Sequence, residues 1–249
     1  MPSAEFFTDV VGESRVSWLF AGRAEGNASL DVGTGGMRGR GAALAQLGLQ
    51  SGDAVFMEQV HGGRAARVGR ADRGRGAAGR ASAIAGVDAL VTTDSSVALT
   101  VLTADCVPVL LLAPGRGVGA VHAGRRGVQA AVVVTAVAAL TRATGSCASR
   151  LSALIGPAIG GCCYEVPAAL ADEVTAVVPA AAATTRWGTP SLDLATAVES
   201  QLRDCGVEMV TRADACTRCG SQRWFSHRAT ADGAPEGRNA SVIVRREMT

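Results

Sequence analysis

The chain has 249 residues, 48% of them hydrophobic, so it can bury a full core in one large domain or two small ones. A formal net charge of +2 argues against a nucleic-acid-binding surface, and no apolar run is long enough to span a bilayer. All 24 basic residues are arginine, which excludes Schiff-base and lysine-base mechanisms. We therefore expect neither a nucleic-acid partner nor a membrane partner.

Cysteine usage indicates a reducing compartment. The number of cysteines is odd, the N-terminus does not read as a signal peptide, and the predicted core is large. These features argue against a disulfide scaffold and favour a cytoplasmic location. The seven cysteines are Cys106, Cys147, Cys162, Cys163, Cys205, Cys216 and Cys219.

The N-terminal third alternates short apolar runs with glycine-rich segments. Residues 18–21 predict a strand, residues 22–41 a loop and residues 42–49 a helix. Residues 54–60 predict a strand that leads into His61. Residues 69–86 lack periodicity and predict a loop with solvated arginines.

The middle of the chain carries the densest strand signal. Its apolar runs are short, nearly continuous and separated by turn residues, as expected for strands covered on both faces. These predicted strands are residues 88–93, 97–103, 107–112, 117–121 and 151–155. Residues 127–142 predict the clearest helix, because they are mostly alanine and valine.

Helices and strands remain mixed toward the C-terminus. Residues 167–178 and 192–205 predict amphipathic helices, and residues 207–211 and 240–245 predict strands. No internal repeat and no clean linker interrupts the chain. We predict a single α+β domain over residues 1–249.

Two of the three histidines and one cysteine end apolar runs. His61, Cys106 and His122 each lie in a turn-like context beside glycine or an acid. Two imidazoles and a thiolate suit zinc, and three protein ligands leave one position open for chemistry. Spacing alone also allows hydrogen-bonded turn histidines and a buried apolar cysteine.

The remaining cysteines are less informative. Cys216 and Cys219 have zinc-knuckle spacing but no second pair, and His227 is a potential third ligand. A structural role is favoured for these three residues. Adjacent Cys162 and Cys163 cannot both face one cavity from an extended chain, so packing is favoured for them, with a place in the site left open.

An ordered set of motifs covers nearly the whole chain. They are residues 58–62 (EQVHG), 88–92 (DALVT), 102–109 (LTADCVPV), 122–127 (HAGRRG), 155–160 (IGPAIG), 162–166 (CCYEV), 216–217 (CT), 225–228 (FSHR) and 237–239 (GRN). In this set the chain resembles the multicopper polyphenol oxidoreductase (laccase-like) family. That family is now understood as zinc-dependent purine nucleoside phosphorylases with adenosine deaminase activity.

The resemblance implies a fold, an activity and a ligand set. It implies stacked mixed β-sheets flanked by helices, in the α/β/β/α layers of cysteine-hydrolase-like domains. It implies phosphorolysis of adenosine, inosine, guanosine and methylthioadenosine, with phosphate as co-substrate, and deamination of adenosine. The family's metal ligands fall on His61, Cys106 and His122, which implies zinc, with copper the weaker choice.

Two departures from the family pattern concern the site walls. Arg125 stands where the family usually has tryptophan in His-Ala-Gly-Trp-Arg-Gly. The N-terminal family motif reads Ala28-Ser29-Leu30-Asp31-Val32-Gly33, and the His-x-Gly-Asp that often follows is absent. Substrate contacts carried over from this loop are therefore in doubt.

Further site roles follow from residue type. Asp105 is a candidate for proton transfer beside His61, Cys106 and His122, or for orienting a ligand or capping a turn. Arg126 is the predicted phosphate partner, with a surface ion pair as the alternative. The other candidates for binding substrate are Gln59, Arg23 and His227.

Other functions remain open on the sequence. Some bacterial members of the family are described as peptidoglycan editing factors, so an editing hydrolase with Cys106 as nucleophile and His122 as base is the serious rival. A copper phenol oxidase needs about ten histidines, far more than this chain has. A non-enzymatic binding role is the third reading, and we expect a monomer or weak homodimer.

Overall fold

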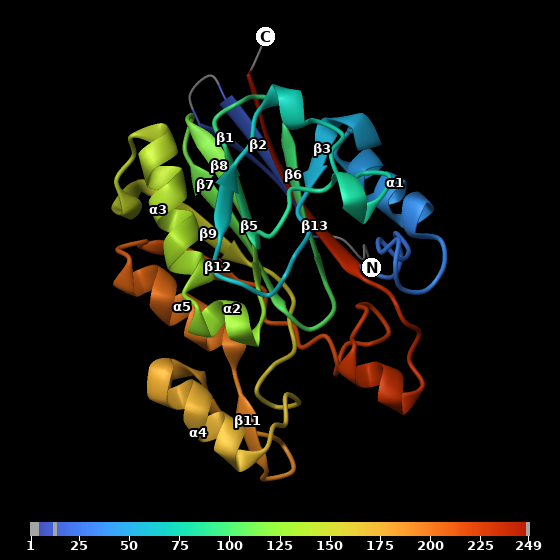
Figure 1. Ribbon diagram of the computed structural model, residues 1–249, viewed down its shortest axis with the longest axis vertical. Helices are drawn as coiled ribbons and strands as arrows, with labels where there is room; N and C mark the ends of the chain where they lie inside the picture. The colour runs from blue at the N-terminus through green and yellow to red at the C-terminus, as the bar shows by residue number, and fades with distance from the viewer. Residues whose placement is uncertain (1–4, 12–13, 248–249) are drawn as a thin grey trace.

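The computed structural model describes residues 5–11 and 14–247, and its two main sheets pack face to face (Figure 1). One sheet has the strand order β1-β2-β13-β6-β3. Strands β3 and β6 pair in parallel, and all other neighbouring strands of this sheet are antiparallel. Its strands are β1 (Glu5–Val11), β2 (Ser14–Ala21), β13 (Asn239–Glu247), β6 (Ala98–Thr103) and β3 (Ala54–Phe56).

The second sheet has six strands in the order β12-β9-β7-β8-β5-β4. Its two edge pairs are parallel and its central pairs are antiparallel. Its strands are β12 (Met209–Arg212), β9 (Ser152–Ile155), β7 (Val107–Ala113), β8 (Gly117–Ala123), β5 (Ala89–Thr92) and β4 (Ala65–Arg67). A separate hairpin pairs β10 (Ala182–Thr184) with β11 (Pro190–Leu192).

Helices cover the outer faces of both sheets, which gives the predicted α/β/β/α layers (Figure 1). Helix α1 (Gly36–Gln46) lies on the five-stranded sheet, and α3 (Val132–Thr144) and α5 (Leu194–Asp204) lie on the six-stranded sheet. The remaining helices are α2 (Arg125–Gln129) and α4 (Ala168–Val177). Among the described residues, no helix is long and apolar enough to cross a membrane.

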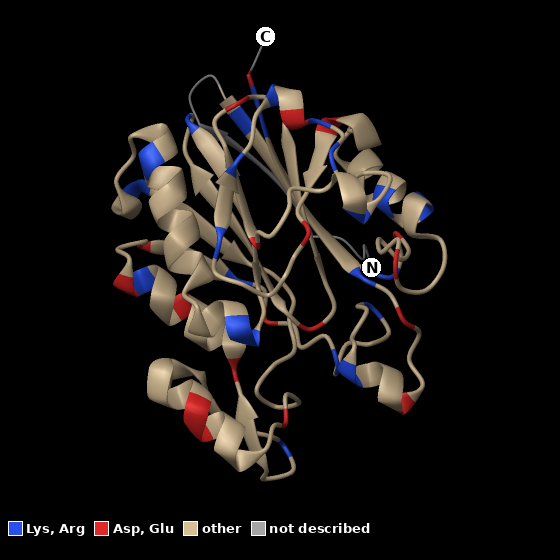
Figure 2. Cartoon of the chain, viewed as in Figure 1, with Lys and Arg blue, Asp and Glu red and all other residues tan. Residues whose placement is uncertain are grey.

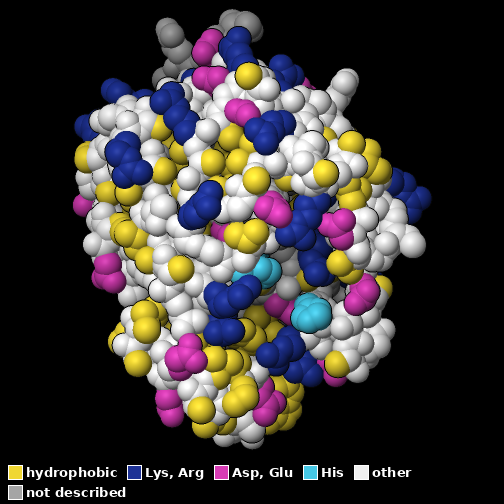
Figure 3. All heavy atoms as spheres, viewed as in Figure 1, with side chains coloured by type: hydrophobic (Ala, Val, Ile, Leu, Met, Phe, Trp, Pro, Cys, Tyr) yellow, Lys and Arg dark blue, Asp and Glu magenta, His cyan; other side chains and the backbone are white. Residues whose placement is uncertain are grey.

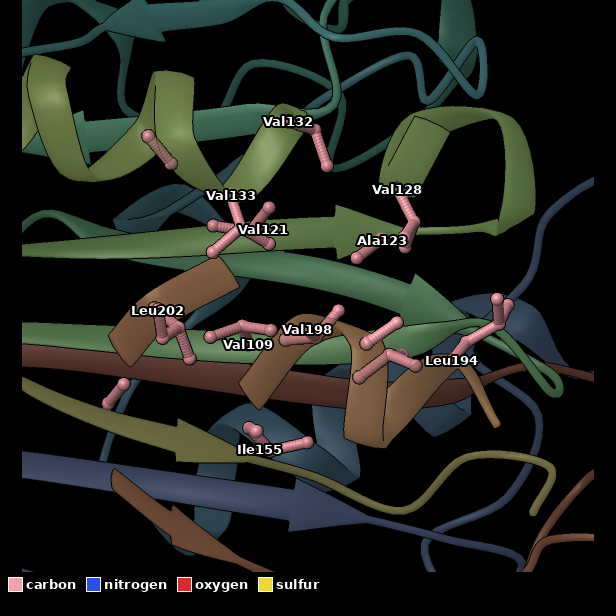
Figure 4. Close-up of a cluster of buried hydrophobic side chains, with 14 of the residues drawn as sticks. Val109, Val121, Ala123, Val128, Val132, Val133, Ile155, Leu194, Val198 and Leu202 are labelled. Atoms are coloured by element: carbon pink, nitrogen blue, oxygen red, sulfur yellow. The ribbon is translucent and has the colours of Figure 1, made fainter. Parts of the chain in front are cut away.

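Strand alternation explains the layering. In β7, Leu110 and Leu112 point into the core between the sheets, while Val109 and Leu111 point toward the helices. Both faces of this strand are therefore apolar, as the continuous hydrophobic run predicts. Val109 lies in the outer core with residues of α3 and α5, where the side chains interlock (Figure 4). Charged residues lie mainly on helices and loops (Figure 2).

The structure confirms the predicted fold class but corrects several elements. Residues 127–142 form two helices, because Ala131 adopts a left-handed backbone (φ 53°) that ends α2 and starts α3. No glycine or proline marks this break. The strand predicted at 54–60 ends at Phe56, and β1, β4, β10 and β11 were not predicted.

The buried face of α3 allows a matched test of the outer core. Val133 is fully buried, whereas its neighbour Val134 is 39% exposed. We expect Val133→Ala to lower the free energy of unfolding by about 2 kcal/mol, through lost burial and a residual cavity. Val134→Ala should change it by less than about 0.5 kcal/mol. Urea denaturation measures both, and equal effects would contradict the described packing of α3.

Candidate metal centre and its cavity

Three connections bring the predicted ligands together. His61 follows β3, Cys106 lies in the turn between β6 and β7, and His122 lies near the end of β8. One potential ligand atom from each residue lies within 4.8 Å of the others. The two imidazole rings have centroids 4.7 Å apart and meet edge to face at 81°. The geometry therefore places the three sequence-predicted ligands in one cluster.

The Asp88 carboxylate connects the two histidines of this cluster through hydrogen bonds. It is fully buried, and its Oδ1 lies 2.8 Å from His122 Nδ1 and accepts the His61 backbone N–H at 2.9 Å. Its Oδ2 accepts the N–H groups of Val60 at 3.2 Å and Gly62 at 2.7 Å. One carboxylate thus fixes both histidines and leaves Nε2 of His122 directed away from it.

Sequence reasoning missed Asp88. Its signal was a charged residue at the start of an almost wholly apolar strand, because such residues are rarely buried without a partner. Burial tends to raise the pKa of this carboxyl, but hydrogen bonds from His122, Gly62 and His61 lower it below its usual value. Asp88 is therefore ionised at neutral pH.

Cys106 and His122 form a charge pair. Burial opposes the thiolate, but the neighbouring His122 lowers the pKa of Cys106 to about 6. Burial likewise opposes the imidazolium, but Cys106 and Asp88 together raise the pKa of His122 to about 9. At neutral pH Cys106 is therefore a thiolate, which is the form that binds metals or attacks carbonyl groups.

The backbone around the cluster is strained. Gln59 (φ 58°), His61 (φ 59°) and Asp105 (φ 87°) adopt left-handed conformations that non-glycine residues rarely occupy. Such strain gathers at functional sites, where the surrounding structure must hold it. A Cβ atom at Gly124 would lie 2.9 Å from the His61 ring and 3.0 Å from Cys106 Sγ. Glycine at 124 therefore permits the close approach of these two residues.

The cluster opens into a cavity of about 470 Å³, within the usual range for small-molecule sites. Histidine side chains lie in the hollow on this face and arginines surround it (Figure 3). The apolar lining includes Phe56 and Met57, and the loop that departs from the family motif contributes Ser29, Asp31 and Val32. The other lining residues are Arg40, Glu58, Gln59, His61, Gly76, Arg80, Ala83, Leu102, Thr103, Ala104, Cys106, His122, His227 and Arg238.

The predicted substrate residues divide into two groups. Gln59 and His227 line the cavity, although the Gln59 amide is fully engaged with the Leu102 backbone, at 2.6 and 2.9 Å. Arg126 is exposed on α2, and Arg23 donates to the Ser221 carbonyl. Neither Arg126 nor Arg23 is among the residues that line this cavity.

Asp105 is buried beside Cys106, and both of its carboxylate oxygens have partners. The Thr217 hydroxyl donates to Oδ1 at 2.6 Å, and the Arg228 backbone N–H donates to Oδ2 at 2.7 Å. These bonds tie the β6–β7 turn to a segment more than a hundred residues later in the chain. Both bonds hold the turn that carries Cys106.

Most of the cavity residues were not predicted as site residues, among them Arg80, Arg238 and Thr103. Arg80 lies in the segment predicted to be a loop with solvated arginines, and its side chain is 55% exposed, as predicted. It also lines the cavity and pairs with Glu58 at 3.3 Å. Arg238 also lines the cavity, beside the C-terminal strand. Thr103 lines it too, and its buried hydroxyl has no hydrogen-bond partner among the described residues.

Related proteins share both sequence and fold with this chain. It is 43% identical to a protein named purine nucleoside phosphorylase from Mycobacterium tuberculosis over 82% of this chain and 77% of that one. A protein of the same name from Streptomyces coelicolor is 44% identical over 76% and 75% of the two chains. The crystal structure of YlmD from Geobacillus stearothermophilus superposes with a TM-score of 0.83, at 32% identity over 95% and 93%.

A second solved structure, Bacillus licheniformis YfiH, matches with a TM-score of 0.80 at 28% identity and covers 93% of this chain and 92% of that one. The family described as multi-copper polyphenol oxidoreductase laccase matches residues 20–246. That span includes the three-residue cluster, the cavity, the whole six-stranded sheet, β3, β6 and most of β13, but neither β1 nor most of β2. The chain therefore belongs to the multi-copper polyphenol oxidoreductase laccase family.

Proposed function

We propose that this protein is a zinc-dependent purine nucleoside phosphorylase that also deaminates adenosine. Its substrates are adenosine, inosine, guanosine and methylthioadenosine. The enzyme cleaves each of them with phosphate, which gives the free base and the corresponding sugar 1-phosphate. The main support for this proposal is that His61, Cys106 and His122 lie together at a cavity that is also lined by arginines. The name of the 43%-identical relative supports the same activity.

The donor set fits zinc. Two imidazoles and one thiolate are ligands that zinc accepts, and Asp88 supplies the carboxylate partner that metal-binding histidines usually have. The lowered pKa of Cys106 keeps it in the ligating form at neutral pH, and binding of zinc would displace the proton from His122. A zinc ion held here would keep one position open and polarise a bound phosphate or water, which serves phosphorolysis and deamination alike.

The arginines account for phosphate binding. In phosphorolysis the bond between C1′ and the purine nitrogen breaks while a phosphate oxygen bonds to C1′, and the base leaves with a proton. Arg238 and Arg80 line the cavity, and a guanidinium fork matches phosphate geometry. We assign phosphate binding to Arg238, in place of the exposed Arg126.

His227 and Asp105 have different proposed roles, one in proton transfer and the other in positioning Cys106. His227 is solvent-exposed and lines the same cavity. An imidazole is a suitable proton donor for the departing base. The Asp105 oxygens are engaged by Thr217 and Arg228, so Asp105 holds the Cys106 turn in place. Phe56 and Met57 offer an apolar wall for the purine ring.

The thiolate at Cys106 also supports a second candidate function. A thiolate paired with an imidazolium is the arrangement of a cysteine hydrolase, so an editing hydrolase acting on cell-wall precursors would use Cys106 as nucleophile and His122 as the base that has taken the thiol proton. This candidate needs no metal. The two functions therefore differ in their response to chelation.

Inosine turnover separates the two functions. We expect pure protein to release hypoxanthine only when phosphate is present, and Cys106→Ala or a strong chelator to abolish the release, because both remove the metal centre. Product analysis by chromatography measures the base and ribose 1-phosphate together. Zinc-loaded, folded protein that releases no base would contradict the phosphorylase proposal, and chelator-insensitive hydrolysis of a cell-wall precursor would favour the rival.

Arginine variants test the phosphate assignment. Arg238→Ala should raise the KM for phosphate about tenfold or more, since a hydrogen bond to a charged group contributes about 1.5–3 kcal/mol. Arg142→Ala removes an exposed charge from α3 and serves as the matched control. Steady-state kinetics at fixed inosine measure the effect. A larger effect from Arg126→Ala would move phosphate binding to the residue predicted from sequence.

Asp88 offers a test of the metal centre itself. In Asp88→Asn an amide N–H₂ replaces one of the two acceptor oxygens, so either His122 or the 60–62 backbone loses its partner. We expect zinc affinity to fall about 10- to 100-fold, the usual cost of losing such a partner. Competition with a metallochromic chelator measures it. Unchanged affinity in a folded variant would show that Asp88 does not organise the ligands.

A further inference from the structure

A second cluster of cysteines lies outside the cavity. Cys162 and Cys163 come from the turn after β9, and Cys216 and Cys219 come from the segment after β12. One sulfur from each lies within 4.8 Å of all the others. The spacing between the two pairs along the chain hid this grouping, and His227 is not part of it.

A turn, not an extended strand, carries the adjacent cysteines. The N–H groups of Cys163 and Tyr164 both donate to the Gly160 carbonyl, at 2.9 and 3.0 Å. The resulting curvature brings the sulfurs of Cys162 and Cys163 to 3.7 Å from each other. The expectation that two neighbouring cysteines cannot face one centre rested on an extended chain, and it is wrong here.

Three of the sulfur separations match the edges of a tetrahedron around one ion, and Cys216 Sγ lies within 4.8 Å of the other three sulfurs. Zinc–sulfur bonds of about 2.3 Å give tetrahedral sulfur–sulfur edges of about 3.8 Å. In the structure the separations are 3.4 Å for Cys163–Cys219, 3.7 Å for Cys162–Cys163 and 3.8 Å for Cys162–Cys219. They are too long for disulfide bonds of about 2.05 Å.

Groups around the sulfurs favour bound thiolates. The Gly160 backbone N–H donates to Cys216 Sγ at 3.3 Å, and an Arg186 guanidinium N–H donates to Cys219 Sγ at 3.7 Å. Such donors neutralise part of the negative charge on sulfur and orient metal-bound thiolates. Three of the four cysteines are buried or half-buried, and Cys219 is exposed. The exposed sulfur gives the ion a path of entry.

We propose that Cys162, Cys163, Cys216 and Cys219 bind a second metal ion, a structural zinc held by four thiolates. Four protein ligands close the coordination shell, which distinguishes this site from the three-residue centre in the cavity. The proposal does not depend on the phosphorylase activity.

The second zinc would clamp the segments that hold Asp105. Residues 158 and 215–217 pair along a short parallel bridge, and the Thr217 N–H donates to the Ala158 carbonyl at 2.9 Å. The Thr217 hydroxyl then binds Asp105, and the Ile159 N–H donates to the Asp105 carbonyl at 3.0 Å. Zinc at the four cysteines therefore stabilises the backbone that positions the Cys106 turn.

Metal analysis of full-length protein purified under reducing conditions tests the proposal. We expect about two zinc ions per chain in the wild type by mass spectrometry of the metal, and about one in Cys219→Ser and in Cys106→Ser. The double variant C106S/C219S should hold none. Cys147→Ser and Cys205→Ser, which change cysteines outside both clusters, should keep two.

Cobalt substitution identifies the ligands without disturbing the four cysteines. Co²⁺ added to zinc-free Cys106→Ser protein should give the intense visible bands of a tetrahedral tetrathiolate site, and one equivalent of Zn²⁺ should bleach them. A Cys106→Ser protein that binds neither zinc nor cobalt would overturn the proposal. Disulfides linking these cysteines in the native protein would overturn it as well.

These measurements test the two proposed metal sites separately. Metal that disappears with Cys219→Ser but not with Cys106→Ser would support the tetrathiolate site and contradict the proposed catalytic centre. Amide hydrogen exchange gives a readout of the clamp, because removing this zinc should speed exchange at Thr217 and Ile159. Unchanged exchange at both amides in a zinc-depleted Cys219→Ser protein would contradict the clamping role.

Discussion

The bond between Asp88 and His122 is the interaction on which the site depends. A buried carboxylate is costly unless every oxygen has a partner, and Asp88 meets this condition through His122 and the backbone N–H groups of residues 60–62. The same bonds hold the strained loop that carries His61. A single ionised group therefore links the orientation of two histidines, the backbone strain and the charge state of the cluster.

The layered sheets explain why three distant residues meet. Strands β3 and β6 belong to one sheet and β8 to the other, so His61, Cys106 and His122 meet where the two packed sheets come together at their strand ends. Strand β7 fixes this packing, because its apolar side chains point alternately into the core between the sheets and toward the helices. Asp105 and the four-cysteine cluster then connect the same region to segments from the C-terminal third.

The sequence was sufficient to predict most of the central strands, because continuous apolar runs are local signals, and the family resemblance supplied the layers and the grouping of His61, Cys106 and His122. Asp88 was harder, since its partners come from the backbone of another loop. The break at Ala131 carries no glycine or proline, and the cavity position of Arg80 depends on how its loop folds back. The pairing of Cys162 and Cys163 with Cys216 and Cys219 spans more than fifty residues and depends on tertiary structure alone.

Anomalous diffraction at the zinc absorption edge, from crystals of the native protein, tests the central claim most directly. The account predicts a peak at about 2.0–2.3 Å from an imidazole nitrogen of His61, Sγ of Cys106 and Nε2 of His122, with Asp88 still bonded to Nδ1 of His122. A fully ordered cluster that shows no anomalous peak in zinc-supplemented crystals, or a peak without Cys106 as a ligand, would contradict it.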